Sequence, residues 1–178
     1  PNNSLYKDYP FLFQKHTKEN MDHPIYQIMH DSIPSHKYFS ISIKNNKIPQ
    51  KLIEKTIIAK IQDGKHKYIN TTYDDNYIIG KSNEFGDFTI LIDSIQPNIR
   101  YHGIKNNIME LSISDELSGI ESYRGEINGK WILMEYDYKT KSLTHKFHTK
   151  PTNNKYIANI TATDNAGNES NLEIDFTR

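Results

Sequence analysis

The chain has 178 residues, with 22 basic and 22 acidic side chains, so its formal net charge at pH 7 is zero. This balance gives no electrostatic attraction to nucleic acid or to an anionic membrane, and we expect neither as a partner. The chain contains no cysteine, which excludes disulfides and thiol redox chemistry. No apolar run approaches the ~18 residues of a spanning helix, so no membrane span is predicted.

The opening 33 residues contain an aromatic cluster and one short strand pattern. The cluster consists of Tyr6, Tyr9, Phe11 and Phe13. Ile25–Met29 follows Pro24 and is predicted to be a strand. The intervening polar stretch from Gln14 to His23 is predicted to be a surface loop. We assign these residues to the first domain as two opening strands.

The rest of the first half consists of alternating segments that predict β-strands. In Tyr38–Ile43, Phe39, Ile41 and Ile43 share one face. Further strands are predicted at Lys55–Ile61, Lys67–Tyr73, Tyr77–Lys81 and Phe88–Ile92, with turns at Asp63-Gly64 and Asp74-Asp75-Asn76. This succession of strands without a helical period predicts a β-sandwich.

A domain boundary is predicted at Ile95–Asn98. Pro97 follows a finished strand and cannot donate a ladder hydrogen bond, so it stiffens the crossing between two domains. The predicted domains are residues 1–95 and 96–178.

The second half repeats the strand pattern and adds strong turn signals. Asn128-Gly129 predicts a type I′ hairpin between Ser122–Ile127 and Lys130–Tyr136. Other strands are predicted near residues 99–102, 109–113, 142–147, 156–162 and 172–176. Two matched corners, SDELSGI (114–120) and ATDNAGN (162–168), each place an Asp before a Gly. The sequence therefore predicts an all-β chain of two consecutive β-sandwich domains, the second immunoglobulin-like.

Asp115 and Asp164 stand in the two matched corners and are the candidate metal ligands. In an immunoglobulin-like sandwich these two loops lie at the same end, so the side chains should converge. Oxygen ligands from several loops suit Ca²⁺, which would stiffen the domain junction. The interpretation that we favour is that each carboxylate accepts backbone N–H bonds and caps its own turn.

Trp131 is the only tryptophan of the chain. On the predicted strand, Trp131 and Leu133 face one way, and Tyr136 faces the other with its apolar neighbours. Both faces are then apolar, so the outer one should be covered by another domain or by a ligand. Trp131 with neighbouring tyrosines such as Tyr136 could stack on a sugar ring, although core or interdomain packing is the interpretation that we favour.

Several longer segments together carry a family resemblance. They are SDELSGIESYRGEINGKWILMEYD, TATDNAGNES and the terminal FTR in the second half, with Pro1–Tyr6, His36–Tyr38 and GKSNEFGDFTILIDSIQPNI in the first. As a set they resemble the C-terminal non-catalytic region of bacterial lysostaphin-type zinc metallopeptidases. The resemblance covers nearly the whole chain, and it suggests enzymes that cut peptidoglycan cross-bridges.

The zinc-binding pattern of that family has no match among the histidines of this chain. Lysostaphin-type catalysis needs a His-x-x-x-Asp pair and a His-x-His pair. Four residues after His16 stands Asn20, and His145 and His148 are spaced so that a strand would point them to opposite faces. We therefore expect no catalytic residue and no cofactor in this chain, with zinc confined to a catalytic domain upstream of Pro1.

The resemblance implies a non-catalytic accessory region that positions or supports a peptidase domain. Its partners would be that upstream domain and cell-wall glycan, in the bacterial cell envelope, either periplasmic or extracellular. The chain begins at Pro1 without a signal peptide, which indicates a piece of a longer secreted precursor. A carbohydrate- or peptidoglycan-binding module and an adhesin-type spacer are the alternatives.

Overall fold

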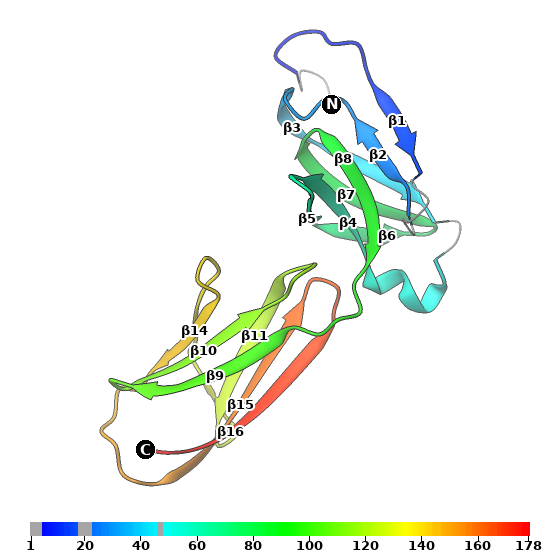
Figure 1. Ribbon diagram of the computed structural model, residues 1–178. Coiled ribbons are helices and arrows are strands. Elements are labelled where there is room, and N and C mark those ends of the chain that lie inside the picture. Colours follow the sequence, from blue (N-terminus) through cyan, green and yellow to red (C-terminus); the bar gives the residue numbers. More distant parts are fainter. Residues whose placement is uncertain (1–4, 18–22, 46–47) are drawn as a thin grey trace. The chain divides into compact units, whose positions relative to one another are not determined.

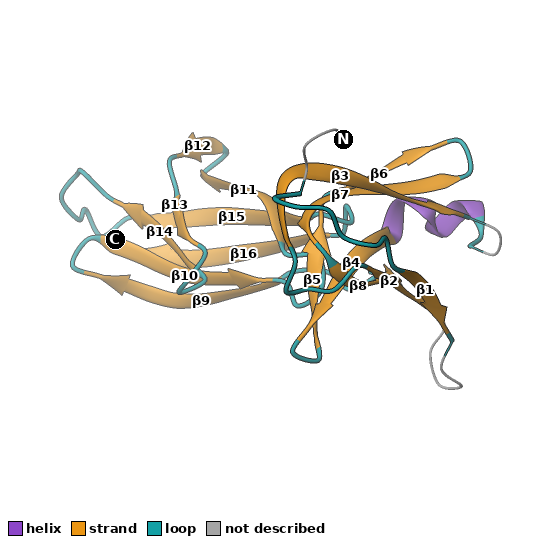
Figure 2. Ribbon diagram, turned by 90° about the horizontal axis from the view of Figure 1, so that it is seen from above, coloured by secondary structure: helices purple, strands orange, loops and turns teal. Residues whose placement is uncertain are grey.

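The computed structural model describes residues 5–17, 23–45 and 48–178. The chain divides into two compact units, Pro1–Ser94 and Ile95–Arg178, and the division falls at the start of the segment predicted as the domain boundary. Both units are built from antiparallel strands (Figures 1 and 2), so the prediction of an all-β chain is confirmed. The described part of the chain contains no helix with the length and apolar character that a membrane span requires.

The described residues of the first unit form a five-stranded and a three-stranded sheet. Their strand orders are β1-β2-β8-β4-β5 and β3-β7-β6. The strands are β1 Phe13–His16, β2 Ile25–Ile28, β3 Pro34–Lys44, β4 Thr56–Gln62, β5 Lys65–Ile69, β6 Thr71–Asp74, β7 Tyr77–Glu84 and β8 Gly86–Ile92. A 3₁₀ helix, η1 (Gln50–Lys55), precedes β4.

The core of the first unit is formed between its two sheets. Ile41 and Ile43 from β3 and Ile78 from β7 pack in one cluster with Ile58 from β4 and Phe88 from β8. Burying each of these side chains contributes about 1.5–3 kcal/mol. The predicted inward face of β3 is confirmed, and the shared core makes this unit a β-sandwich.

The single strand predicted at Lys67–Tyr73 is wrong. The chain leaves β5 after Ile69 and enters β6 at Thr71, and these strands pair with β4 and β7 in different sheets. The Thr71 hydroxyl donates to Ile69 O at 2.6 Å and accepts from the Ile58 N–H at 3.0 Å. This hydroxyl supplies hydrogen bonds at the crossing, so the chain can change sheets within one residue.

The predicted loop from Gln14 to His23 is wrong at its start. Residues Phe13–His16 form β1, which pairs with β2 so that Phe13 faces Ile28. All four residues of β1 are exposed, which explains why no apolar alternation marks the strand. Residues 18–22, which include Asn20, lie outside the described residues.

The helix η1 was also not predicted, and Lys55 closes this helix rather than opening a strand.

The second unit consists of two four-stranded sheets, β13-β14-β10-β9 and β12-β11-β15-β16. The strands are β9 Asn98–Lys105, β10 Ile108–Ser114, β11 Ile120–Ile127, β12 Lys130–Ile132, β13 Glu135–Asp137, β14 Ser142–Lys146, β15 Lys155–Asp164 and β16 Glu169–Thr177. In chain order this is the ABED sheet and the CFG sheet of an immunoglobulin fold, with β12 added beside the C strand. The predicted immunoglobulin-like sandwich is confirmed.

The core of the second unit confirms the predicted inward faces. Met109, Leu111 and Ile113 of β10 are buried against Ala158 and Ile160 of β15, which lies in the opposite sheet. At the end of β11, Asn128 and Gly129 have φ values of 49° and 74°, as a type I′ turn requires.

The single strand predicted at Lys130–Tyr136 is wrong. Its first part, β12, pairs with β11, and its second part, β13, pairs with β14 in the other sheet. Met134 lies at the crossing and is buried. Its sulfur occupies the space beside Gly125, where a Cβ atom would lie only 2.4 Å away. The crossing therefore depends on a glycine in β11.

Candidate functional site

The corner that follows β10 is held by Asp115. Its Oδ2 accepts backbone N–H bonds from Leu117, Ser118 and Gly119, at 2.9, 2.8 and 2.8 Å. Gly119 has a φ of 79°, so it adopts the left-handed conformation for which glycine is suited. The carboxylate replaces the partners that these N–H groups would have in a sheet.

The corner that follows β15 has the same construction around Asp164. Its Oδ1 accepts backbone N–H bonds from Ala166 and Asn168 at 2.8 Å, and its Oδ2 accepts from the Asn168 side-chain amide at 2.8 Å. Gly167 has a φ of 67°. The two corners are therefore matched in geometry as well as in sequence.

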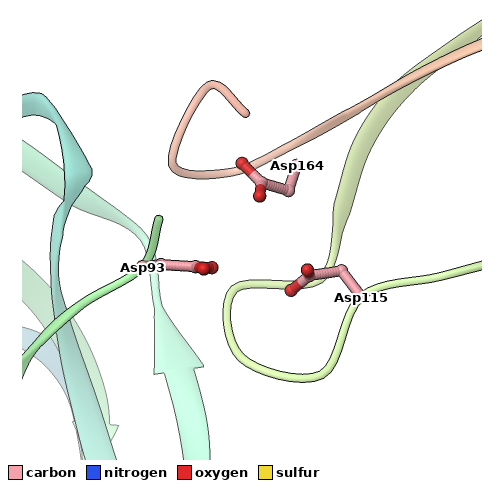
Figure 3. Close-up of side chains that lie close together, drawn as sticks. All are labelled: Asp93, Asp115 and Asp164. Carbon is pink, nitrogen blue, oxygen red and sulfur yellow. The ribbon is translucent and has the colours of Figure 1, made fainter. Parts of the chain in front are cut away.

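The two corners lie side by side, as predicted. Asn165 donates from its side-chain amide to Ser118 O at 2.9 Å and from its backbone N–H to Gly119 O at 3.1 Å. One carboxylate oxygen of Asp115 lies within 4.8 Å of one of Asp164 (Figure 3). Asp93, also drawn in Figure 3, belongs to the first unit, where its N–H donates to Lys55 O at 2.7 Å.

The hydrogen bonds of both aspartates are those that the capping interpretation expects. We therefore predict that EDTA, or calcium added at millimolar concentration, shifts the melting temperature by no more than about 1 °C, because a ligand stabilises only the state that it binds. Scanning calorimetry with magnesium at equal ionic strength as the control makes this measurement. A rise of several degrees with calcium alone would establish a calcium site at these corners.

The exposed run His30-Asp31-Ser32 brings together the residue types of a hydrolase triad. His30 Nδ1 lies 3.0 Å from Asp31 Oδ1 and 2.9 Å from Ser32 Oγ. Both contacts go to one ring nitrogen, whereas a catalytic triad uses one nitrogen for each partner. The run has the geometry of a hydrogen-bonded turn.

Trp131 lies on the outer face of the sheet β12-β11-β15-β16. Its neighbour Ile132 packs against the core, so Trp131 must point to the opposite side of β12. The Trp131 side chain is 59% exposed. The interpretation of Trp131 as a core residue is wrong.

Tyr136 does not share a face with Trp131. It belongs to β13 in the other sheet, where its ring lies 5.7 Å from that of Tyr123 and its hydroxyl reaches Ile113 O at 3.5 Å. Burial raises the pKa of the Tyr136 hydroxyl. The two residues were grouped in the sequence because one strand was assumed to carry both.

Three polar residues continue across the sheet from Trp131. The strand registers place Trp131 opposite Glu126, Glu126 opposite Asn159, and Asn159 opposite Glu173. We call these four residues the Trp131 row. With about 4.8 Å between neighbouring strands, the row is about 14 Å long. The four strands β12, β11, β15 and β16 form one sheet, and all four are labelled in Figure 2.

A cavity lies at the end of the same sheet, next to the Trp131 row. Its volume is about 580 Å³, and Asn128, Ile157 and Asp175 are among the residues that line it. Ile157 pairs with Asp175 two residues from the Asn159–Glu173 pair, and therefore on the same face. Asn128 Oδ1 accepts the Ile157 N–H at 2.9 Å, which fixes the turn against this edge of the cavity.

The first unit has a separate cavity of about 690 Å³. Tyr6 and Phe11, two members of the predicted aromatic cluster, line it together with Phe39 and Phe85. The rings of Phe39 and Phe85 stack with centroids 4.8 Å apart. The aromatic cluster therefore contributes to a surface cavity of the first unit.

Sequence reasoning found Trp131 but missed Glu126, Asn159 and Glu173. The pairing of Glu126 with Trp131 could have been predicted, because a two-residue turn at Asn128-Gly129 pairs Ile127 with Lys130 and hence Glu126 with Trp131. The other two depend on how β15 and β16 align with β11. No local signal in the sequence fixes that alignment.

Two tandem β-sandwich units, the second immunoglobulin-like, define the class of this protein. The family model of the Zu5-like domain matches residues 1–93, which is just over half of the chain. The chain therefore belongs to the Zu5-like domain family, and the matched residues coincide with the first unit. A search of curated proteins found no match.

Proposed function

We propose that this chain is the non-catalytic accessory region of a cell-envelope peptidoglycan metallopeptidase, and that it positions a zinc domain encoded elsewhere in the same protein. The resemblance of its segments to that region supports the proposal. The observation that carries it concerns two kinds of side chain in the second unit. The corner carboxylates Asp115 and Asp164 hold turns, whereas the indole of Trp131 is exposed on a sheet face, where it can contact a surface.

The physical role would be to raise the local concentration of the catalytic domain at the wall. A second contact that is covalently tied to the enzyme makes substrate encounter intramolecular, which increases occupancy without any change at the catalytic centre. The partners in this proposal are the peptidase domain and wall glycan. The location is the bacterial envelope, on the periplasmic or extracellular side.

A fusion experiment tests this function. The chain is joined to the C-terminus of a lysostaphin-type zinc domain, and peptide release from insoluble sacculi is compared with that of the zinc domain carrying a neutral linker of equal length. We expect release from sacculi to rise about fivefold or more, while a soluble cross-bridge peptide is cleaved equally by both. The chain alone, supplied with zinc, should release nothing.

Two results would contradict the proposal. Peptide release by the chain alone would make it an enzyme. Equal release from sacculi by the two fusions would show that the chain does not position the catalytic domain.

A further inference from the structure

We propose that the outer face of the sheet β12-β11-β15-β16 binds a glycan strand of neutral sugar rings, with Trp131 as its stacking platform. This inference rests on the proposed function, since it names the ligand by which the chain would hold the wall. It assigns a role to the Trp131 row (Trp131, Glu126, Asn159 and Glu173).

The first argument is the placement of Trp131. An indole exposed to this extent on a sheet face leaves a large apolar surface in water. A flat ring with an apolar face and a polar N–H suits a ligand that is itself apolar on one face and polar at its rim. A sugar ring has that character, with C–H groups on its faces and hydroxyl groups at its edge.

The second argument is the chemistry of the rest of the row. The carboxylates of Glu126 and Glu173 accept hydrogen bonds, and the amide of Asn159 both donates and accepts. Hydroxyl groups of sugars can satisfy each of them. Because one residue comes from each of four adjacent strands, the groups follow a line about 14 Å long. A line of this length suits several consecutive rings of an extended strand.

The third argument is charge, which selects among polymers. Asp175 and Glu169 lie on the same face as Glu173, at alternate positions of β16, and all three are exposed. Arg124 is paired with Glu126, with 2.7 Å between Nη2 and Oε1. Lys155 also lies on this face, at an alternate position of β15 from Asn159, so four carboxylates stand against two basic side chains. This acidic excess disfavours anionic polymers such as nucleic acids, and anionic membranes. Uncharged sugar rings are compatible with this charge, and the exposed indole and the hydrogen-bonding groups of the row favour them over other neutral ligands.

The experiment uses the intrinsic fluorescence of Trp131, the single tryptophan of the chain. The whole chain is titrated with a soluble β-1,4-linked tetramer of N-acetylglucosamine. We expect a blue shift of the emission and weaker quenching by acrylamide, because a bound sugar ring removes water from the indole. An unchanged spectrum together with no pelleting on purified sacculi would overturn the proposal.

Variants then test the row itself, with pelleting on sacculi as the readout. Trp131→Ala should weaken binding by about tenfold or more, the loss typical of a central aromatic contact. Trp131→Phe should retain part of the affinity. Asn159→Ala should weaken binding severalfold. Tyr138→Ala is the matched control, because Tyr138 is 72% exposed but follows β13 of the other sheet.

Thermal melts show whether each variant is folded, and folded Trp131 variants that bind as tightly as the original chain would overturn the proposal. Failure of this inference differs from failure of the proposed function. If Trp131→Ala leaves binding intact while the fusion still accelerates release from sacculi, the function stands and the site is wrong. If the row binds glycan but the fusion gains nothing, the site stands and the function is wrong.

Discussion

Replacing Glu84 with alanine is expected to destabilise the first unit by about 2 kcal/mol. The Lys60 side chain is only 7% exposed, and its Nζ lies 2.7 Å from Glu84 Oε2. Lys60 lies on β4 and Glu84 on β7, so the pair joins the two sheets of the unit. Without Glu84, the ammonium group of Lys60 would lose its carboxylate in a mostly buried position. The Glu84 side chain is itself 44% exposed, so water can reach the site, and the cost stays below that of breaking a fully buried pair.

Urea unfolding followed through isoleucine methyl resonances in the first unit measures this loss. Tryptophan fluorescence would not serve, because Trp131 reports on the second unit. Lys67→Ala is the matched control, since Lys67 also contacts Glu84, at 3.4 Å, but is mostly exposed. It should cost no more than about 1 kcal/mol. An equal cost for the two variants would show that Lys60 is well solvated without its partner.

Substitution of both partners should behave differently from substitution of one. Replacing Lys60 and Glu84 together with methionine removes the buried charge along with its partner, so it should cost far less than Glu84→Ala alone. A double variant as unstable as Glu84→Ala would show that the loss arises from packing rather than from charge.

The Lys60–Glu84 pair also makes the stability of the first unit depend on pH. The hydrogen bond from Lys60 is the main cause that holds the pKa of Glu84 below its ordinary value. Because the pKa of Glu84 is lower in the folded state than in the unfolded state, its contribution to the stability of the folded state is fully present above the unfolded pKa of about 4.3. It is lost as the pH falls through the folded value. In Glu84→Gln, this part of the acid sensitivity should be absent.

The inward faces of the strands could be predicted because alternation is a local property. Ile41 and Ile43 in the first unit, and Met109, Leu111 and Ile113 in the second, lie where the alternation places them. The turn at Asn128-Gly129 could be predicted for a similar reason, because few dipeptides other than Asn-Gly readily adopt positive φ at two adjacent residues.

The two sheet crossings could not be predicted from alternation. Around Asn70, and again within the apolar run Trp131–Met134, the chain changes sheets with no Gly or Pro to mark the change. Both sheets of a sandwich face one core, so a strand that crosses keeps its buried side. The same limit applies to the Trp131 row. Its local pair with Glu126 follows from a turn, whereas Asn159 and Glu173 join only through the assembled sheet.

Replacing Gly125 with alanine is expected to destabilise the second unit by about 2–3 kcal/mol. A Cβ at this position would lie 2.4 Å from Met134 Sδ, 3.0 Å from Met134 Cγ and 3.1 Å from Ile132 Cγ1. The φ of Gly125 is not in the left-handed region, so the cost is steric overlap at the crossing between β12 and β13. Urea unfolding followed through isoleucine methyl resonances of the second unit measures it.

A second substitution tests whether the cost of Gly125→Ala arises from steric overlap with the Met134 side chain. Met134→Ala alone should cost about 2–5 kcal/mol, because it empties a buried space. In that background Gly125→Ala should cost less than about 1 kcal/mol, since the new methyl group then enters the space that the methionine left. Strong non-additivity would show that Gly125 is present to admit Met134, and hence that the crossing is fixed by packing. Equal costs in both backgrounds would mean that the glycine serves β11 itself and that the crossing has another cause.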